Sequence, residues 1–420
     1  MAMVSEPPKQ GFRLSQLIYD TRYRSLTIQV IVFMLFMAGA GWLVDNTVRN
    51  LQALGKDFNF GFLWNRAGYD IAQTLVPYTN DSTHARALLV GLLNTLWISF
   101  LGCIAATVIG VFVGVLRLSR NWLVSRLMTI YVEVFRNVPL LLWILVFLAL
   151  FTETMPAPNA YRVNAETGEA QESLFLGLIA PTNRYTAIPS AEFSRSLGAI
   201  DTALAPISLN ALLILAVIVG SVFANRWLLN RARLIQEKTG ARPVTWWQSL
   251  LVLLGPLAAV LVALGFHVSI PELKGFNFAG GVNVTNAFVV LWLALSLYTG
   301  AFIAEIVRAG VLAISKGQTE AAFALGLRPR RTMSLVILPQ ALRVIIPPLI
   351  SQFLNLTKNS SLAIAVGYMD LRGTLGGITL NQTGRELEAI LLMMLIYLAI
   401  SLIISGGMNI YNSRVKLKER

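Results

Sequence analysis

Eight long apolar stretches constrain the fold of this chain more than any other feature. A helix needs about 20 apolar residues to cross a bilayer, and eight stretches come close to or exceed that length. Only 13% of the residues are charged, against about 25% in ordinary soluble domains. This composition excludes a soluble enzyme, a nucleic-acid-binding domain and a fibrous protein, and predicts an all-α polytopic membrane protein. The stretches are 25–44, 88–116, 127–151, 206–224, 248–266, 286–307, 334–356 and 388–411.

The charges between these stretches indicate how the chain crosses the membrane. Counted from the N-terminus, the odd-numbered segments carry 21 Lys and Arg against 5 Asp and Glu, and the even-numbered ones 11 against 13. Because Lys and Arg concentrate in cytoplasmic loops, we expect eight spans with both termini in the cytoplasm. The net charge of +13 then reflects topology and needs no nucleic acid. The odd-numbered segments are 1–24, 117–128, 225–247, 308–333 and 412–420.

The first apolar stretch is open to two interpretations. Arg22 and Arg24 precede it, as basic residues precede the apolar part of a signal peptide. Its apolar part is longer than that of a signal peptide, and no small-residue cleavage site follows it. We therefore favour an uncleaved membrane anchor.

Two pairs of ionisable residues lie within or at the ends of predicted spans. Glu133 and Arg136 are three residues apart in one span, and Glu305 and Arg308 repeat this spacing in another. Residues three apart on a helix are neighbours, so each pair can neutralise itself locally. The alternative is a functional role, since charges inside a membrane are costly and often mark a pathway or gate.

The segment 317–339 predicts a short helix on the cytoplasmic face, followed by re-entry into the membrane. Thr319 is a candidate N-cap, and Glu320 in a first helical turn suits the positive end of the helix dipole. Gly326 can adopt the left-handed conformation that ends a helix, and Pro329 can begin the next one. Such a short, exposed helix can dock in a groove of a soluble partner.

The spacing of Glu320-Ala321-Ala322, Gly326 and Ile337-Leu338-Pro339 resembles the EAA loop of ABC importer permeases. In that family the loop forms a coupling helix that docks on a cytoplasmic ATPase. The resemblance implies this role for Gly317, Glu320, Ala321, Ala322, Gly326, Arg328 and Pro339.

Further segments resemble the polar amino-acid permeases among the type I ABC importers. They are Gly91–Leu96, Glu133–Leu141, Tyr298–Arg308 and Leu356–Leu362. The resemblance covers about 88–150 and 286–410 and implies the five-helix core of that family plus three extra spans. The enlarged layout is similar to one permease of the general L-amino-acid importers of the Aap and Bzt type.

The resemblance implies five regions along the chain. An extra span and a periplasmic loop (1–87) precede the first part of the core (88–151). An insertion with an acidic loop and two further spans (152–284) separates it from the second part (285–411), which carries the coupling loop 317–339, and a basic tail (412–420) follows. The sequence does not indicate what the insertion does.

A polar cluster follows the seventh stretch and is a candidate part of the substrate path. It consists of Asn355, Lys358, Asn359, Ser360 and Ser361. Lys358 and the hydroxyl groups can meet a carboxylate of an amino acid; alternatively, Lys358 only anchors the helix at the membrane interface. The apolar residues 362–366 that follow are too few to span and are expected to re-enter the bundle.

The resemblance implies a permease subunit of an ATP-driven amino-acid importer in a bacterial inner membrane, working by alternating access. The substrates implied are polar or acidic L-amino acids, or a broad range. The chain has no G-x-x-x-x-G-K-[ST] phosphate loop, which ATP binding of that type requires. ATP and Mg²⁺ are therefore expected in a partner ATPase dimer, with no cofactor bound by this chain. The other implied partners are a second, different permease and a periplasmic amino-acid-binding protein.

Two other functions stay open, an ion-coupled secondary transporter and a membrane scaffold or membrane enzyme. The scaffold does not explain the complete EAA pattern. No repeated half of the type common in secondary transporters is visible. With two histidines and one cysteine, we expect no metal site and no catalytic residues.

Overall fold

The computed structural model describes residues 21–53, 55, 57–163, 170–202 and 204–415, which form two compact units. The first unit, Met1–Phe62, contains helix α2 (Thr21–Ala53). None of the described α2 side chains is buried within this unit, as suits a helix whose surroundings are lipid. The second unit is Leu63–Arg420, and a 3₁₀ turn (Gly61–Trp64) lies where the two meet in sequence. The expected segments 1–20 and 416–420 lie outside the described residues.

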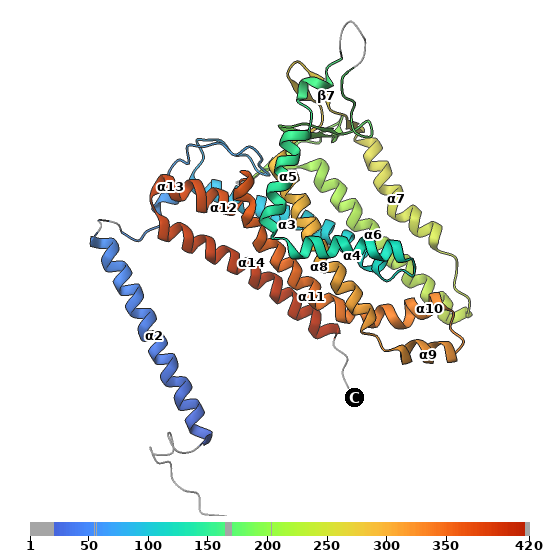
Figure 1. Cartoon of the computed structure of the whole chain (residues 1–420). Helices are drawn as coiled ribbons and strands as arrows, with labels where there is room; N and C mark the ends of the chain where they lie inside the picture. The colour runs from blue at the N-terminus through green and yellow to red at the C-terminus, as the bar shows by residue number, and fades with distance from the viewer. Residues whose placement is uncertain (1–20, 54, 56, 164–169, 203, 416–420) are drawn as a thin grey trace, which may run out of the picture. The chain divides into compact units, whose positions relative to one another are not determined.

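The second unit is mainly helical (Figure 1). Short polar side chains cap several helices: the Thr83 hydroxyl accepts a hydrogen bond from the Arg86 amide, and Thr285 does the same for Phe288. Such caps satisfy amides that the first helical turn leaves free. The helices are α3 (His84–Arg117), α4 (Trp122–Asn137), α5 (Leu140–Thr154), α6 (Leu209–Thr239), α7 (Trp246–Ala263), α8 (Asn286–Leu312), α9 (Lys316–Ala324), α10 (Pro329–Thr332), α11 (Leu338–Asn359), α12 (Leu371–Gly373), α13 (Leu380–Thr383) and α14 (Glu386–Val415).

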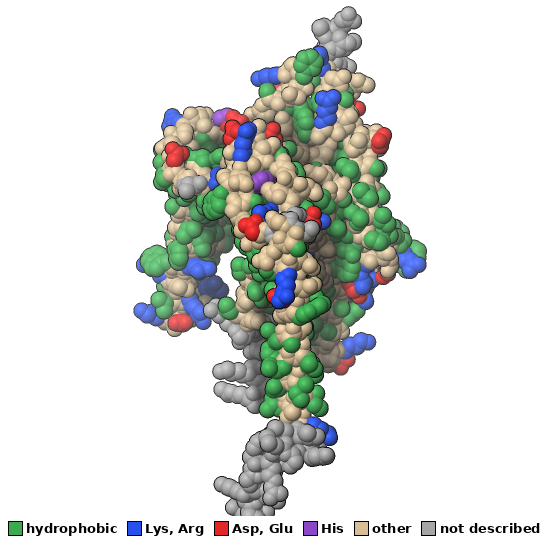
Figure 2. Space-filling model, turned by 90° about the vertical axis from the view of Figure 1, so that its left-hand side faces the viewer, with side chains coloured by type: hydrophobic (Ala, Val, Ile, Leu, Met, Phe, Trp, Pro, Cys, Tyr) green, Lys and Arg blue, Asp and Glu red, His purple; other side chains and the backbone are tan. Residues whose placement is uncertain are grey.

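Seven helical segments in the described chain are long and apolar enough to cross a membrane, and a bent pair brings the number to eight. This confirms the prediction of an all-α membrane protein with about eight spans. On the face shown in Figure 2, hydrophobic side chains cover the middle of the helices and charged side chains gather toward their ends. The seven segments are Arg24–Ala53, His84–Arg117, Leu209–Thr239, Trp246–Ala263, Asn286–Leu312, Pro329–Val366 and Glu386–Tyr411.

The expected continuous span 127–151 is wrong in one respect, because it is two helices. α4 and α5 meet at a bend of 107°. Val138 has an extended backbone with φ −105° and ψ 132°, directly before Pro139. A residue before proline is driven out of the helical region, so α4 ends here and α5 starts in a new direction (Figure 1).

The insertion between α5 and α8 carries short antiparallel strands that the sequence did not indicate. In one three-stranded sheet β2 lies between β1 and β9, with Tyr185 opposite Thr285. The other pairs are β3 with β6, β4 with β5, and β7 with β8. The strands are β1 (Ala180–Pro181), β2 (Tyr185–Ile188), β3 (Ser190–Phe193), β4 (Ala199–Asp201), β5 (Pro206–Ser208), β6 (Phe266–Ser269), β7 (Glu272–Lys274), β8 (Asn277–Ala279) and β9 (Val282–Thr285).

The strands and α9 lie at opposite ends of the second unit (Figure 1). We call the end with the strands the sheet side and the end with α9 the α9 side. α8 runs from the sheet side, where it follows β9, to the α9 side, while α11 runs back in the opposite direction.

The core of the second unit is built on a close contact between α3 and α8. Glycines on both helices let the backbones approach, as in many membrane helix pairs. A Cβ atom added to Gly110 would lie 2.5 Å from the Ile303 Cβ, and one added to Gly114 would lie 2.7 Å from the Ala304 carbonyl oxygen. No larger side chain fits at either glycine without moving the helices apart.

After α11 the chain folds back against α3 instead of leaving the bundle. A 3₁₀ helix (Ser360–Val366) leads to Gly367, whose φ of 73° reverses the chain, and α12, a π-helical turn (Thr374–Thr379) and α13 follow. Leu371 and Leu375 are fully buried. The re-entry expected for residues 362–366 therefore takes the form of a longer segment, 360–383, packed within the bundle.

Candidate functional site

The segment with the EAA pattern forms a short, well-ended helix at the α9 side. α9 ends in a pair of backbone bonds: the Leu327 amide donates to the Ala322 carbonyl and the Gly326 amide to the Phe323 carbonyl. Gly326 has φ +75°, as expected for a glycine just after a helix end in this motif. Pro329 then opens α10 as predicted. The start differs from expectation, because Ser315 and not Thr319 precedes the helix, and Glu320 lies in its second turn.

α9 exposes most of its surface. Ala322 is buried (3% exposed) and holds the helix to the unit, whereas Glu320, Ala321 and Gly326 are exposed. Leu325 is 82% exposed beside them. Gly317, Arg328 and Pro339 are also exposed. A small-residue surface with exposed apolar side chains at its end is suited to contact another protein.

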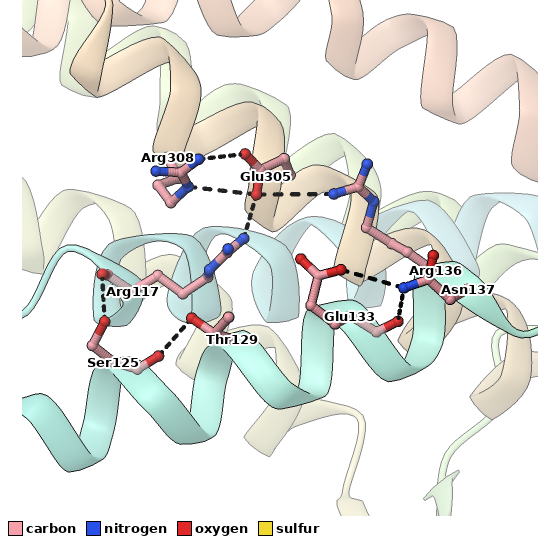
Figure 3. Close-up of polar contacts among 8 residues, drawn as sticks. All are labelled: Arg117, Ser125, Thr129, Glu133, Arg136, Asn137, Glu305 and Arg308. Carbon is pink, nitrogen blue, oxygen red and sulfur yellow. Dashed lines mark hydrogen bonds and ion pairs between the residues drawn. The ribbon is translucent and has the colours of Figure 1, made fainter.

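Near the α9 side, three arginines from three helices surround the carboxylate of Glu305 (Figure 3). Arg308 on the same helix, α8, donates to it at 2.7 Å. Arg117, at the end of α3, makes a short charged hydrogen bond to the same carboxylate. Arg136, on α4, stands farther off, with 4.0 Å between its Nη1 and the Glu305 Oε2. One carboxylate therefore links α3, α4 and α8.

The local pairing expected from the sequence is confirmed for one pair and wrong for the other. Glu305 and Arg308 form the expected contact within α8. The described Glu133 and Arg136 side chains form no ion pair with each other; the Asn137 amide lies 3.3 Å from the Glu133 carboxylate, while Arg136 points across to Glu305 (Figure 3). The arginine is directed to another helix because Glu305 lies opposite α4.

The Arg117 side chain is 8% exposed, and its Nε atom is buried without a hydrogen-bond partner among the described residues. The Nε of Arg136 is likewise buried and unpartnered. A buried guanidinium is costly unless it is paired. The charges of the three guanidinium groups are thus compensated by Glu305, the carboxylate that faces all three.

A polar cavity of about 210 Å³ lies between α8 and α11. Three residues of the predicted substrate cluster line it, Asn355, Lys358 and Asn359. The other two do not: the Ser360 hydroxyl donates to the Thr357 carbonyl and the Ser361 hydroxyl to the Lys358 carbonyl. The remaining lining residues are Tyr298, Thr299, Phe302 and Gln352.

The cavity and the arginine cluster meet at Phe302. Its ring lines the cavity, and the guanidinium carbon of Arg136 lies 5.3 Å from the ring centre. This is within the range of cation–π attraction. Along α8, Thr299, Phe302, Glu305 and Arg308 follow one another toward the α9 side, so the cluster lies beyond the cavity on that side.

A second buried polar group pins the segment 360–383 to α3. The Leu371 amide donates to the Thr95 hydroxyl at 3.0 Å, and the Asn94 side chain donates to the Met369 carbonyl at 2.8 Å. Asp370 accepts the Gly373 amide at 2.8 Å and is fully buried.

Sequence reasoning missed Arg117, Phe302 and Gln352 as members of these sites. Arg117 enters the sequence analysis only as a charge of the loop after the second apolar stretch, and Gln352 only as part of an apolar stretch. Phe302 enters it as part of an apolar stretch and of the segment Tyr298–Arg308 that resembles the amino-acid permeases. Gln352 and Asn355 are three residues apart on a helix and share a face, so this spacing was a usable signal. Nothing in the sequence places Arg117 opposite Glu305.

The chain matches a family described as "Binding-protein-dependent transport system inner membrane component" over residues 106–417. The chain belongs to this family. It is therefore a membrane permease subunit. This confirms the resemblance to ABC importer permeases found in the sequence, and the expectation that the chain is a transporter component and not an enzyme. The family assignment gives no support to the ion-coupled alternative.

Full-length relatives agree with this assignment. The permease is 63% identical over 426 residues, covering 100% of both chains, to the "Glutamate/glutamine/aspartate/asparagine transport system permease protein BztB" of Rhodobacter capsulatus. It is 41% identical to the "General L-amino acid transport system permease protein AapQ" of Rhizobium johnstonii, over 98% of this chain and 96% of that one. A "Putative amino-acid ABC transporter permease protein YhdX" of Escherichia coli is 42% identical over 94% of this chain and 95% of that one.

Proposed function

We propose that this permease imports amino acids across a bacterial inner membrane, powered by ATP hydrolysis in a separate ATPase dimer. The observation that carries the proposal is the exposed helix α9, which holds the Glu320-Ala321-Ala322 part of the EAA pattern and is followed by Gly326, in a chain of this family. In the proposed mechanism the α9 side faces the cytoplasm, as the basic loops predict. ATP binding closes the ATPase dimer, and α9 transmits the motion to the spans.

The proposed substrates are polar and acidic L-amino acids. Two observations support this class: the substrates named for the 63% identical relative, and the polar lining of the cavity between α8 and α11. Lys358 offers a positive charge to a carboxylate, and Gln352 and Asn355 offer amide groups that bind either a carboxylate or an amide. The cavity is proposed as one substrate-binding position along the translocation path.

The proposed complex contains two further components, a second permease of the same fold and an external amino-acid-binding protein. The family description itself names binding-protein dependence. The insertion with its strands is proposed to take part in receiving that protein, because it stands at the end opposite α9 (Figure 1).

Purification of the tagged permease from its native host tests this function directly. We expect an ATPase, a second permease and a soluble amino-acid-binding protein to copurify, and the complex in liposomes to accumulate glutamate or glutamine only with ATP and the binding protein. Recovery of this chain alone, with uptake that follows an ion gradient, would overturn the proposal.

Replacing the cavity lysine tests the proposed substrate path. Lys358→Met should lower uptake of glutamate by roughly ten- to a hundredfold, since a hydrogen bond to a charged group contributes about 1.5–3 kcal/mol. Lys238→Met is the matched control, because Lys238 is an exposed lysine in the last turn of α6, away from the strands. Rates of labelled glutamate uptake in proteoliposomes decide the matter. Equal rates for both variants would exclude Lys358 from the path.

A further inference from the structure

We propose that Arg136 is the mobile residue of a gate that closes the cavity toward the α9 side. In the closed state its guanidinium group lies over the Phe302 ring and faces the carboxylate of Glu305, and Glu305 itself does not move. This inference rests on the proposed function, because a gate has a role only in a translocation path. It assigns different parts to the three arginines around Glu305, and it brings in Phe302.

The first support is the position of the gate relative to the cavity. Phe302 lines the cavity and lies under the Arg136 guanidinium. Glu305 is one helical turn farther toward the α9 side and about 10 Å from the end of α8, at 1.5 Å per residue. Along α8 the Phe302 ring and the Arg136–Glu305 contact follow the cavity toward the α9 side, so the proposed path leads past them.

The second support is that two of the three arginines are held by rigid structure. Arg308 is on α8 itself, so its contact to Glu305 does not cross between helices. Arg117 comes from α3, which is locked to α8 where Gly110 and Gly114 let the backbones touch. Neither arginine can leave Glu305 by a movement of whole helices without breaking that packing.

The third support is that Arg136 has the opposite properties. Its distance to Glu305 is 4.0 Å, the longest of the three contacts. Its side chain is 34% exposed, as is that of Arg308, against 8% for Arg117. It lies in the last turn of α4, beside the 107° bend at Val138 and Pro139. The earlier part of α4 stays on α8, where the Tyr131 hydroxyl donates to the Leu297 carbonyl at 2.6 Å. A rearrangement of only the last turn of α4 at this bend moves Arg136 away from Phe302 and Glu305, while the other two arginines keep the carboxylate paired.

The electrostatics fit this division. Glu305 is shared by three guanidinium groups, so its carboxylate stays paired when one of them departs. Arg136 in turn gains a cation–π contact and a long ion pair in the closed state. Contacts of this kind contribute little each, which suits a gate that has to open in every transport cycle.

The test measures how fast a cysteine in the cavity reacts with a reagent supplied from the α9 side. The reporter is Asn355→Cys in a Cys103→Ser background, since Cys103 is the only cysteine of the chain. The full complex in inside-out vesicles, without nucleotide, is treated with a membrane-impermeant charged maleimide. Labelling does not require transport, so the reporter serves even where uptake is weakened.

We expect Arg136→Gln to raise the labelling rate about fivefold, the change in open population that about 1 kcal/mol produces. Arg308→Gln is the matched control, because it removes an arginine from the same carboxylate without freeing α4, and the rate should stay the same. Labelling of right-side-out vesicles should not change with either variant. Arg136→Lys keeps the charge but not the flat stacking group, and should give a smaller increase.

Two results would overturn the inference. One is an unchanged labelling rate in Arg136→Gln. The other is an equal rise of the labelling rate in Arg308→Gln, which would mean that the arginines act together as one structural unit. ATP-driven uptake by the unaltered complex is measured separately, in proteoliposomes that enclose ATP and receive the binding protein and substrate from outside. Absence of that uptake counts against the proposed function. Normal uptake together with either overturning result counts against the gate alone.

Discussion

Glu320→Lys is expected to abolish ATP-driven uptake while the permease remains inserted in the membrane in normal amounts. Glu320 is exposed on α9 and has no structural partner among the described residues that would be lost on substitution. Reversing its charge therefore acts on the contact with the proposed ATPase and not on folding, because like charges facing each other in an interface are strongly unfavourable. Uptake in proteoliposomes and copurification of the ATPase are the two measurements.

A matched control exists at the same side of the molecule. Glu237 is an exposed glutamate near the end of α6, paired at 3.6 Å with Arg233. Glu237→Lys should leave both uptake and copurification unchanged, since exposed pairs contribute little. If Glu320→Lys retains normal uptake, α9 is not the coupling helix.

A substitution at Gly326 tests through the backbone conformation whether α9 is the coupling helix. Gly326→Pro is incompatible with φ +75°, because proline fixes φ near −65°, so the end of α9 must change shape. Gly240 ends α6 with φ +73° and provides the same geometry on another helix. Loss of uptake in Gly326→Pro but not in Gly240→Pro assigns the effect to α9; equal losses would mean that general instability is the cause.

Glu305→Gln is expected to give the largest loss of stability of any single substitution discussed. It leaves Arg117, which is 8% exposed, and its two neighbouring arginines without a counter-charge. Removing one partner of a buried ion pair typically costs about 3–5 kcal/mol. The purified complex should therefore unfold at a clearly lower temperature, and less of it should reach the membrane.

Two comparisons separate buried charge from other effects of this substitution. Glu237→Gln removes a carboxylate from an exposed pair and should change stability by less than about 0.5 kcal/mol. Glu305→Gln combined with Arg117→Gln removes the buried charge together with its partner and should recover part of the loss. An unfolding temperature unchanged by Glu305→Gln would show that water reaches the arginines and that burial does not govern the cluster.

The sequence was sufficient for the spans because the rule behind them is local. Lipid offers no hydrogen bonds to the backbone, so an apolar stretch of sufficient length must be helical. The same holds for the end of α9, where Gly326 and Pro329 dictate backbone angles by their own chemistry. The start of α9 was misplaced at Thr319, because several residues near it, including Ser315, are acceptable at a helix N-terminus.

The break between α4 and α5 has a local cause, Pro139, which hydropathy does not register. Pro139 was visible in the sequence, yet hydropathy alone runs through it and predicts one span. Proline is tolerated in many membrane helices, so its presence does not by itself decide between a slight kink and a bend of 107°. The strands of the insertion were missed for another reason, since each described strand has only two to four residues and carries no detectable period.

The sequence by itself determined the membrane class, the apolar stretches, the family and the short helix that begins the EAA pattern, because each follows from residues that are neighbours along the chain. The tertiary structure decided the pairing of charges and the lining of the cavity. Arg136 turned from Glu133, three residues away, to Glu305 on another helix. The close contact of α3 with α8 at Gly110 and Gly114 brought Arg117 to the same Glu305 carboxylate. Such contacts depend on how helices cross, and local sequence does not encode the crossing of two distant helices.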